Sequence, residues 1–352
     1  MAGKKPVLSI VEGPGPRTRS RSLAVEWRAW LVENLLAGVD RAKIIAGLVA
    51  RGVPVATARR EVAATATSPL LPVCGELAAR ARRLELAHAL TRAHARQDAA
   101  PTEIERRTTP PAAEFFRHYW AAHRPVVLTD ASAGWPARTW TPDGFRRRFG
   151  RVTVEVTSGR DADPEYDANV DAHRTRMTMA RFIDRVLAAG RSNDLYMVAN
   201  NHTMQRPAFR GLLDELRPPP ELFHPPRATG FSLWIGPAGT ITPLHHDTTN
   251  ILFCQLHGRK QVELVSPSET ALLAATLRGF YSTIDLDHLA AHPHPAVRAM
   301  LVRRVVLAPG EALFIPAGWW HRVTSLDVSI SVSLLSWRRA NDFDWYRPGT
   351  VS

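Results

Sequence analysis

Short apolar segments separated by glycine and proline run from residue 231 to residue 335, and they constrain the fold more than any other feature of this 352-residue chain. Each segment has the length of a β-strand and is too short for an ordinary helix. Many short strands with turn residues between them are typical of an antiparallel barrel or a double-sheet jelly roll. The predicted strands are Phe231–Ile235, Asn250–Leu256, Lys260–Val265, Arg304–Leu307, Ala312–Ile315 and Val328–Leu335.

The N-terminal part of the chain has a different composition. Residues 1–22 are rich in Pro, Gly, Ser and Arg and are expected to form a flexible basic arm. Residues 23–100 are expected to be helical, because Trp27, Trp30 and neighbouring leucines recur at helical spacing. The β domain is expected to cover residues 105–345. Within it we predict early strands at 125–128, 152–156 and 195–199, a helix at 178–188, and a polar, more helical insertion at 268–300.

Composition limits the choice of compartment and partner. Basic residues number 45 and acidic residues 33, which gives a formal net charge of +12. This charge permits contact with nucleic acid, but no nucleic-acid-binding motif accompanies it, so a solvated surface is favoured. Two cysteines exclude a disulfide framework. No apolar run reaches the roughly 18 residues of a membrane span, and no signal peptide is recognisable, so we expect a soluble cytoplasmic protein without a membrane partner.

The segment around His245 carries the first metal-binding pattern. Side chains alternate along an extended chain, so His245 and Asp247 point to one face and His246 to the other. An imidazole and a carboxylate on one face can bind the same metal ion. A second histidine would complete the facial set that leaves positions open on iron. Because the chain has 14 histidines, this pair alone is weak evidence, and His246 is expected only to pack or to support it.

His321 is the best candidate for the missing ligand. A turn at Pro309-Gly310 precedes a predicted strand, and Pro316 and Gly318 then turn the chain again just before His321. This second strand–turn–histidine unit follows His245 by 76 residues. The two units together indicate a metal site far more strongly than either does alone.

Lys260 is notable because only four of the 45 basic residues are lysines. It lies thirteen residues after Asp247, at the start of a predicted strand. A compact ammonium group suits the capture of a single carboxylate. Any chain with four lysines must place them somewhere, but the position of this one relative to Asp247 favours carboxylate binding.

These segments together resemble the cupin-like JmjC hydroxylases, the group that includes the asparaginyl hydroxylase of hypoxia-inducible factor. The resemblance covers about residues 105–345 and leaves out residues 23–100. Its motifs are Thr242-Pro-x-His245-x-Asp247-x-x-Asn250, Gln255-x-x-Gly258-x-Lys260, the segment from Pro309 to His321, and the upstream segments Phe116–Leu128, Gly134–Pro136 and Phe231–Gly239.

The resemblance implies a mainly β catalytic domain. Its core would be a double-stranded β-helix, also called a jelly roll or cupin fold, with flanking helices and the helical N-terminal region before it. His245, Asp247 and His321 would hold Fe(II). 2-Oxoglutarate would chelate the metal through its 2-oxo acid group, and O₂ would be the second cosubstrate.

The resemblance also implies which residues contact 2-oxoglutarate. Its distal carboxylate would pair with Lys260 and would be reached by the hydroxyl groups of Thr242 and Tyr196. Asn250 matches an asparagine near the metal-binding end of the cosubstrate. Ser333 stands where the asparaginyl hydroxylase has a second asparagine, and its hydroxyl group can still form a hydrogen bond.

The implied reaction couples the conversion of 2-oxoglutarate to succinate and CO₂ with hydroxylation of a C–H bond. The favoured substrate is a side chain of a peptide or protein. Alternatives that stay open are demethylation of an N-methyl group, hydroxylation of a tRNA base, and a cupin-fold binding protein without catalysis. The helical region also leaves a homodimer open. Candidate walls of the substrate pocket are Trp234, Trp319 and Trp320, although packing in the core explains these tryptophans equally well.

Overall fold

The computed structural model describes residues 23–98, 100, 102–198, 203–273 and 281–343. It divides the chain into two compact units, Met1–Leu90 and Thr91–Ser352, and each unit is described by itself. The predicted flexible arm at residues 1–22 lies outside the described residues.

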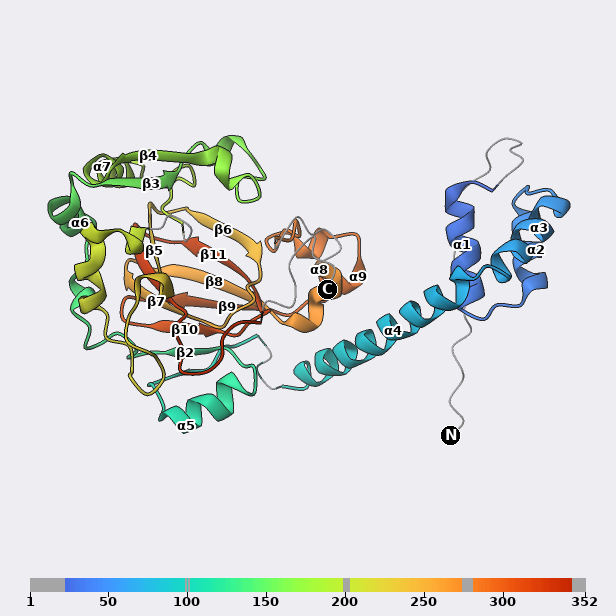
Figure 1. Ribbon diagram of the computed structural model, residues 1–352, viewed down its shortest axis with the longest axis horizontal. Coiled ribbons are helices and arrows are strands. Elements are labelled where there is room, and N and C mark those ends of the chain that lie inside the picture. Colours follow the sequence, from blue (N-terminus) through green and yellow to red (C-terminus); the bar gives the residue numbers. More distant parts are fainter. Residues whose placement is uncertain (1–22, 99, 101, 199–202, 274–280, 344–352) are drawn as a thin grey trace. The chain divides into compact units, whose positions relative to one another are not determined.

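The first unit is helical (Figure 1). Trp27 and Trp30 pack against Leu31, Ile44 and other buried residues, so the predicted apolar stripe forms a core. The carboxylate of Asp40 accepts hydrogen bonds from the backbone N–H groups of Ala42 and Lys43 in the first turn of α2, which makes it the N-cap. The helices are α1 (Val25–Leu36), α2 (Arg41–Ala50), α3 (Val55–Ala66) and α4 (Leu70–Ala95), whose last five residues belong to the second unit.

No single helix among the described residues is long and apolar enough to cross a membrane. The pair α3 and α4 passes that test together, by length and composition only, with a bend of 71° between the two helices.

The second unit has a core of mostly β-sheet (Figure 1). One sheet has six strands in the order β1-β2-β10-β7-β12-β5, and the other has four in the order β6-β11-β8-β9. A separate pair is formed by β3 and β4. The strands are β1 (Arg106–Arg107), β2 (Val126–Leu128), β3 (Thr153–Thr157), β4 (Arg174–Thr178), β5 (Phe231–Gly236), β6 (Ile241–His245), β7 (Ile251–His257), β8 (Lys260–Val265), β9 (Val302–Leu307), β10 (Ala312–Ile315), β11 (Trp320–Ser325) and β12 (Ser329–Leu334).

Alternating side chains let the two large sheets share one apolar core. Successive residues of a strand point to opposite faces, and one cluster of buried residues draws on both sheets. From the six-stranded sheet it takes Val127, Ile251, Phe253, Leu313 and Ile315, and from the four-stranded sheet Val262, Leu264, Val305, Leu307 and Val323.

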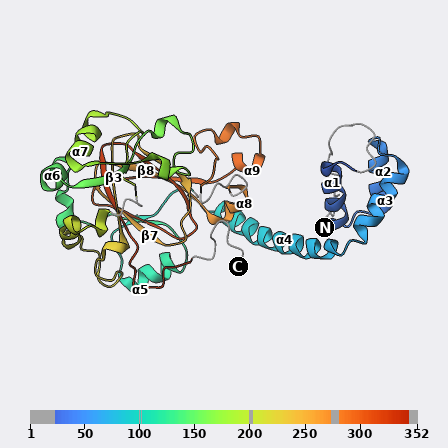
Figure 2. The same cartoon turned by 45° about the horizontal axis from the view of Figure 1, so that its top comes forward.

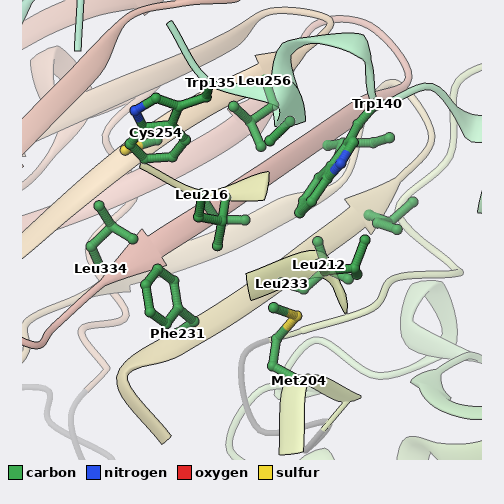
Figure 3. Close-up of a cluster of buried hydrophobic side chains, with 14 of the residues drawn as sticks. Trp135, Trp140, Met204, Leu212, Leu216, Phe231, Leu233, Cys254, Leu256 and Leu334 are labelled. Atoms are coloured by element: carbon green, nitrogen blue, oxygen red, sulfur yellow. The ribbon is translucent and has the colours of Figure 1, made fainter. Parts of the chain in front are cut away.

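Helices cover the outer face of the six-stranded sheet. Phe115, Phe145 and Phe182 come from three different helices and belong to one buried cluster with side chains of β7, β10 and β12. Part of that cluster appears in Figure 3, and α6 and α7 pack against each other (Figure 2). The helices of this unit are α5 (Ala112–Phe115), which continues into a π-helical turn (Phe116–Trp120), α6 (Pro142–Phe149), α7 (Met179–Ala188), α8 (Thr270–Leu273) and α9 (Pro295–Arg298).

Several local predictions are corrected. The predicted strand at 195–199 is not a regular strand in its described part, because Tyr196 pairs with Thr157 while Met197 pairs with Ile235, each in an isolated bridge. Strands β4, β6 and β11 form where no strand was predicted.

Candidate metal centre and cosubstrate cavity

The three predicted metal ligands lie together at the ends of two neighbouring strands. His321 of β11 sits opposite His245 of β6 in an antiparallel pair, and the centroids of the two imidazole rings are 4.1 Å apart. Asp247 follows the end of β6. Its Oδ2 lies 3.8 Å from Nε2 of His245 and 3.5 Å from Nε2 of His321. One donor atom from each residue therefore falls within 4.8 Å of the other two.

Backbone carbonyl groups fix the orientation of both imidazoles. Nδ1 of His245 lies 2.7 Å from the carbonyl oxygen of Pro243, and Nδ1 of His321 lies 2.9 Å from that of Trp319. A carbonyl oxygen only accepts, so each Nδ1 carries the proton and each Nε2 is left with a free lone pair. Burial, followed by the neighbouring His245, lowers the pKa of His321 to about 4, which favours its neutral, metal-binding form.

This donor set fits iron(II). Two imidazole nitrogens and one carboxylate oxygen that converge from one side form the facial arrangement used by non-haem Fe(II) oxygenases. Orientation of each ligating imidazole by a hydrogen bond from its other nitrogen is the usual supporting feature of such sites. The site can thus hold a divalent metal with coordination positions left open.

The turn before β11 is tied to the segment that carries Asp247. The backbone N–H of Gly318 donates to the carbonyl oxygen of Asp247 at 2.7 Å, and Gly318 adopts a φ of 76°, which favours glycine. The side-chain oxygen of Asn250 accepts from the N–H of Ala317 at 2.9 Å. These bonds hold His321 in register with Asp247.

A cavity of about 280 Å³ opens beside the metal ligands. Both sheets contribute to its wall, together with loops near residues 167, 196 and 281. The lining residues are Asp167, Val170, Tyr196, Val198, Ser232, Trp234, Thr242, His245, Asp247, Thr249, Ile251, Phe253, Tyr281, Ile315, His321, Val323, Ser333 and Leu335.

Lys260 lies behind the aromatic wall of this cavity. Its side chain is fully buried, and its Nζ donates a hydrogen bond of 2.8 Å to the hydroxyl oxygen of Tyr196. Nζ also lies 5.3 Å from the ring centroid of Phe253 and 6.0 Å from that of Trp234. Burial lowers the pKa of Lys260 to about 7.

The distance between Lys260 and the metal ligands suits a short dicarboxylate. Leu264 of β8 is opposite His321 in the sheet, and Lys260 is four residues earlier on the same strand. At roughly 3.3 Å per residue, the backbone of Lys260 lies about 13 Å along the strand from the position opposite His321. The lysine side chain covers part of that span, and a five-carbon dicarboxylate bound at the metal would cover the rest.

Comparison with known proteins is consistent with this geometry. A family model described as a cupin-like domain matches residues 112–342, which is more than half of the chain. The chain belongs to the cupin-like domain family.

Relatives of this cupin-like protein include proteins named for their JmjC domain and others named lysine-specific demethylases. It is 32% identical to the lysine-specific demethylase JMJ30 of Arabidopsis thaliana over 65% of this chain and 54% of that one. It is 29% identical to lysine-specific demethylase 8 of Xenopus tropicalis over 63% of this chain and 50% of that one. The chain thus spans about half the length of these curated relatives. JmjC oxygenases use Fe(II), 2-oxoglutarate and O₂.

The cupin-like domain brings most of the predicted cosubstrate residues to the cavity. Thr242, Tyr196 and Ser333 line it. The Nε1 of Trp234 donates to the hydroxyl oxygen of Ser333 at 2.9 Å, which makes Trp234 part of the same wall. Asn250 is not among the lining residues, since its amide oxygen is engaged by Ala317.

The other two tryptophans that were predicted as walls of the pocket, Trp319 and Trp320, do not line this cavity. Trp320 neighbours His321 on β11, so its side chain points to the opposite face. There it is buried and donates to the hydroxyl oxygen of Thr270. Trp319 is also buried, and its indole donates to the carbonyl oxygen of His123. The prediction that these two tryptophans line the pocket is therefore corrected: both pack in the protein interior outside it.

His246 behaves as its position in the sequence predicts. It points away from His245 and packs against the ring of Trp320, with 4.6 Å between the ring centroids. Burial lowers its pKa, which favours the neutral imidazole.

Sequence reasoning missed an acidic group in the wall of the cavity. Asp167 lines the cavity, and its side chain is only 11% exposed. Its Oδ1 lies 3.7 Å from the guanidinium group of Arg160, while its Oδ2 is buried with no hydrogen-bond partner among the described residues. Burial raises the pKa of Asp167 to about 6 in spite of Arg160. No sequence motif marks this aspartate, because it lies in a polar loop far from the metal ligands along the chain.

Arg160 is held in place by neighbours of the cavity. Its side chain is 1% exposed, and its Nη2 donates to the carbonyl oxygen of Ile241 at 2.7 Å. The guanidinium group also stacks over Tyr166, 4.2 Å from the ring centroid. Tyr281 also lines the cavity, with its ring centroid 5.6 Å from that of His245.

Proposed function

We propose that the protein is an Fe(II)- and 2-oxoglutarate-dependent oxygenase that hydroxylates a C–H bond on a side chain of a peptide or protein. The observation that carries the proposal is the convergence of His245, Asp247 and His321 beside a cavity that is backed by the buried ammonium group of Lys260. The two facing sheets support a double-stranded β-helix as the scaffold of this site.

Each of these residues has a defined task. His245, Asp247 and His321 would hold the metal through two Nε2 atoms and a carboxylate oxygen. Lys260 and the hydroxyl group of Tyr196 would bind the distal carboxylate of 2-oxoglutarate and set its direction toward the metal. Apolar wall residues such as Phe253 and Ile315 would keep water away from the reacting centre.

When bound, Fe(II) with 2-oxoglutarate and O₂ supplies the oxidising chemistry, with one oxygen atom passing to the substrate and the other to succinate. The protein contributes by holding the reactants in a fixed geometry. Positioning of this kind supplies a large part of the rate enhancement in many enzymes.

The position of Asp167 supports the proposal that the substrate side chain carries a positive charge or several N–H donors. The carboxylate faces the cavity and has an acceptor atom, Oδ2, left without a partner among the described residues. A buried acceptor of this kind gains free energy when a donor reaches it. Arg160 would fix the carboxylate through the other oxygen.

A second candidate function is demethylation of an N-methyl group, in which the hydroxylated methyl group leaves as formaldehyde. The names of the relatives favour it, since the two proteins compared above are both called lysine-specific demethylases. A cationic methyl-lysine would also suit Asp167. The metal and cosubstrate residues serve both reactions equally.

The test uses the full chain purified without oxygen and loaded with Fe(II). Succinate formation from 2-oxoglutarate is measured against a panel of basic, neutral and methylated peptides, a tRNA pool, and no substrate. Formaldehyde is measured in the same tubes. We expect succinate release to be stimulated by a peptide, most strongly by one with a basic residue.

The products separate the candidates. A mass gain of one oxygen on the peptide supports hydroxylation, and formaldehyde with loss of a methyl group supports demethylation. Stimulation by tRNA alone would replace the proposed substrate. Absence of succinate from a metal-loaded sample under every condition would contradict the oxygenase and favour a binding protein.

A further inference from the structure

The long helix α4 exposes more apolar surface than a helix in water normally does. None of its residues is buried by the part of the chain that the structure describes. Leu70, Leu77 and Leu84 are 69%, 61% and 58% exposed. Apolar residues that recur along one side of a helix ordinarily pack against another surface. We therefore expect α4 to have a binding partner.

The three leucines belong to a regular stripe. They are spaced by seven residues, and Cys74, Ala81 and His88 each follow a leucine by four. Core residues of a two-stranded coiled coil are spaced alternately by four and three residues. In this helix the leucines would occupy one of the two core positions of each heptad, and Cys74, Ala81 and His88 would occupy the other. We call this set, Leu70, Cys74, Leu77, Ala81, Leu84 and His88, the leucine stripe.

The helical bundle of the same unit lies on another side of α4. A Cβ atom placed on Gly75 would meet the side chain of Leu36 of α1 at 3.6 Å. Gly75 is five residues from Leu70, which places it about 140° around the helix. Leu86 also falls on that far side. The leucine stripe therefore faces away from the contact with α1.

We propose that two copies of this chain pair through their leucine stripes as a parallel, in-register, two-stranded coiled coil. In that register, the residue just before Ala81 lies beside the residue five positions later in the partner helix. Arg80 and Glu85 occupy those two positions. The dyad thus brings each Arg80 next to the Glu85 of the partner helix, twice per dimer.

A membrane span would be a different role for this helix, and the charge pattern opposes it. α3 and α4 satisfy the length and composition of a bent span only when taken together. Glu76, Arg82 and Arg83 lie in the middle of α4, and all three are exposed. A coiled coil keeps such residues in water, whereas insertion would bury them at a high cost.

The association state of the full chain tests the proposal. Sedimentation velocity over a concentration series should give a reversible dimer for the wild type. Leu77→Glu should weaken the dimer at least about 100-fold, since it places two carboxylates in the seam. Leu86→Glu is the matched control, because Leu86 is also 61% exposed but lies off the stripe, and it should leave the dimer intact. Circular dichroism checks that both variants keep their helices.

Cys74 reports the register directly. It is exposed and lies in the seam, whereas Cys254 is buried in the other unit. A parallel, in-register pair places the two Cys74 thiols face to face. Mild oxidation should then link most of the dimer covalently, and Cys74→Ser should abolish the link.

Charge exchange gives a second, independent reading. Arg80→Glu should weaken association by roughly tenfold because it makes two like-charged contacts. Adding Glu85→Arg to that variant should restore it. A monomer at every concentration, a dimer that survives Leu77→Glu, a dimer without a Cys74 link, or a monomer that binds anionic lipid vesicles would each overturn the proposal.

Discussion

The cavity of the cupin-like domain and the helix α4 depart from ordinary globular structure in opposite ways. The cavity buries polar groups: Lys260 is fully buried, and Asp167 is nearly so. α4 exposes apolar groups, with Leu77 largely in water. Both arrangements cost stability in the isolated chain. A buried charge indicates a missing ligand, and an exposed apolar stripe indicates a missing partner, so the two regions identify two separate functions.

The largest effect expected at the cavity comes from removing the buried cation. Lys260→Ala should raise the KM for 2-oxoglutarate by about 100- to 1000-fold, because the distal carboxylate would then be buried without its counter-charge. Steady-state succinate kinetics measure it. Lys43→Ala, at an exposed lysine of α2, is the control and should leave the KM unchanged. An equal KM in both variants would remove Lys260 from the binding site.

The pH dependence of cosubstrate binding sharpens the same contrast. Burial has already lowered the pKa of Lys260 to about 7 in the free protein, so its ammonium group loses its proton above that pH. Binding of the carboxylate requires that proton. The Kd of 2-oxoglutarate should therefore rise about tenfold for each pH unit above 7.

Calorimetry on the Mn(II)-loaded protein between pH 6 and pH 9, with the metal content checked at each pH, measures this slope. Lys260→Arg keeps a charged group throughout the range and should give a flatter profile, although its affinity is lower. A flat profile for the wild type would show that the ammonium group is not the titrating partner.

Removing the acceptor in the cavity wall should have a smaller effect. Asp167→Asn should lower kcat/KM for a basic peptide by about 10- to 100-fold, the worth of one hydrogen bond to a charged group. The KM for 2-oxoglutarate should not change. Asp171→Asn, on the same loop but with a side chain that is 90% exposed, should be neutral. A loss of equal size with neutral peptides would assign Asp167 a structural role.

The smallest effect is expected at Asn250. Asn250→Ala leaves the backbone N–H of Ala317 without its acceptor and should lower the free energy of unfolding by about 1–3 kcal/mol. Urea denaturation measures it. The sequence resemblance predicts a cosubstrate contact instead. A KM for 2-oxoglutarate that rises tenfold while stability is unchanged would support that prediction and contradict the anchoring role.

Much of the sheet could be predicted because its strands bury apolar residues in short, punctuated runs. The sequence predicts strands β7, β8 and β10 to within about one residue of the bounds that the structure shows. β6 was missed because Pro243 interrupts its pattern. The strand tolerates proline because it lies at the edge of the four-stranded sheet. β11 was missed because His321 and Arg322 replace apolar residues in its sequence.

The candidate metal site could be predicted further than the cavity around it. His245 and Asp247 are close in sequence, and the approach to His321 is encoded locally by Pro316 and Gly318. Asp167 comes close to the metal ligands only in the folded chain, and no motif in its local sequence indicates a role in the site. Trp320 illustrates the converse, because a residue next to a candidate ligand in sequence points to the opposite face.

Metal binding by the purified chain tests the central claim most directly. The protein stripped of metal is titrated with Mn(II), with and without 2-oxoglutarate, and bound metal is counted by mass spectrometry and calorimetry. We predict one metal ion per chain, bound more tightly when 2-oxoglutarate is present, and loss of that binding in His321→Ala with the fold intact. Metal binding that is unchanged in His321→Ala, or 2-oxoglutarate binding that is independent of metal, would contradict the account.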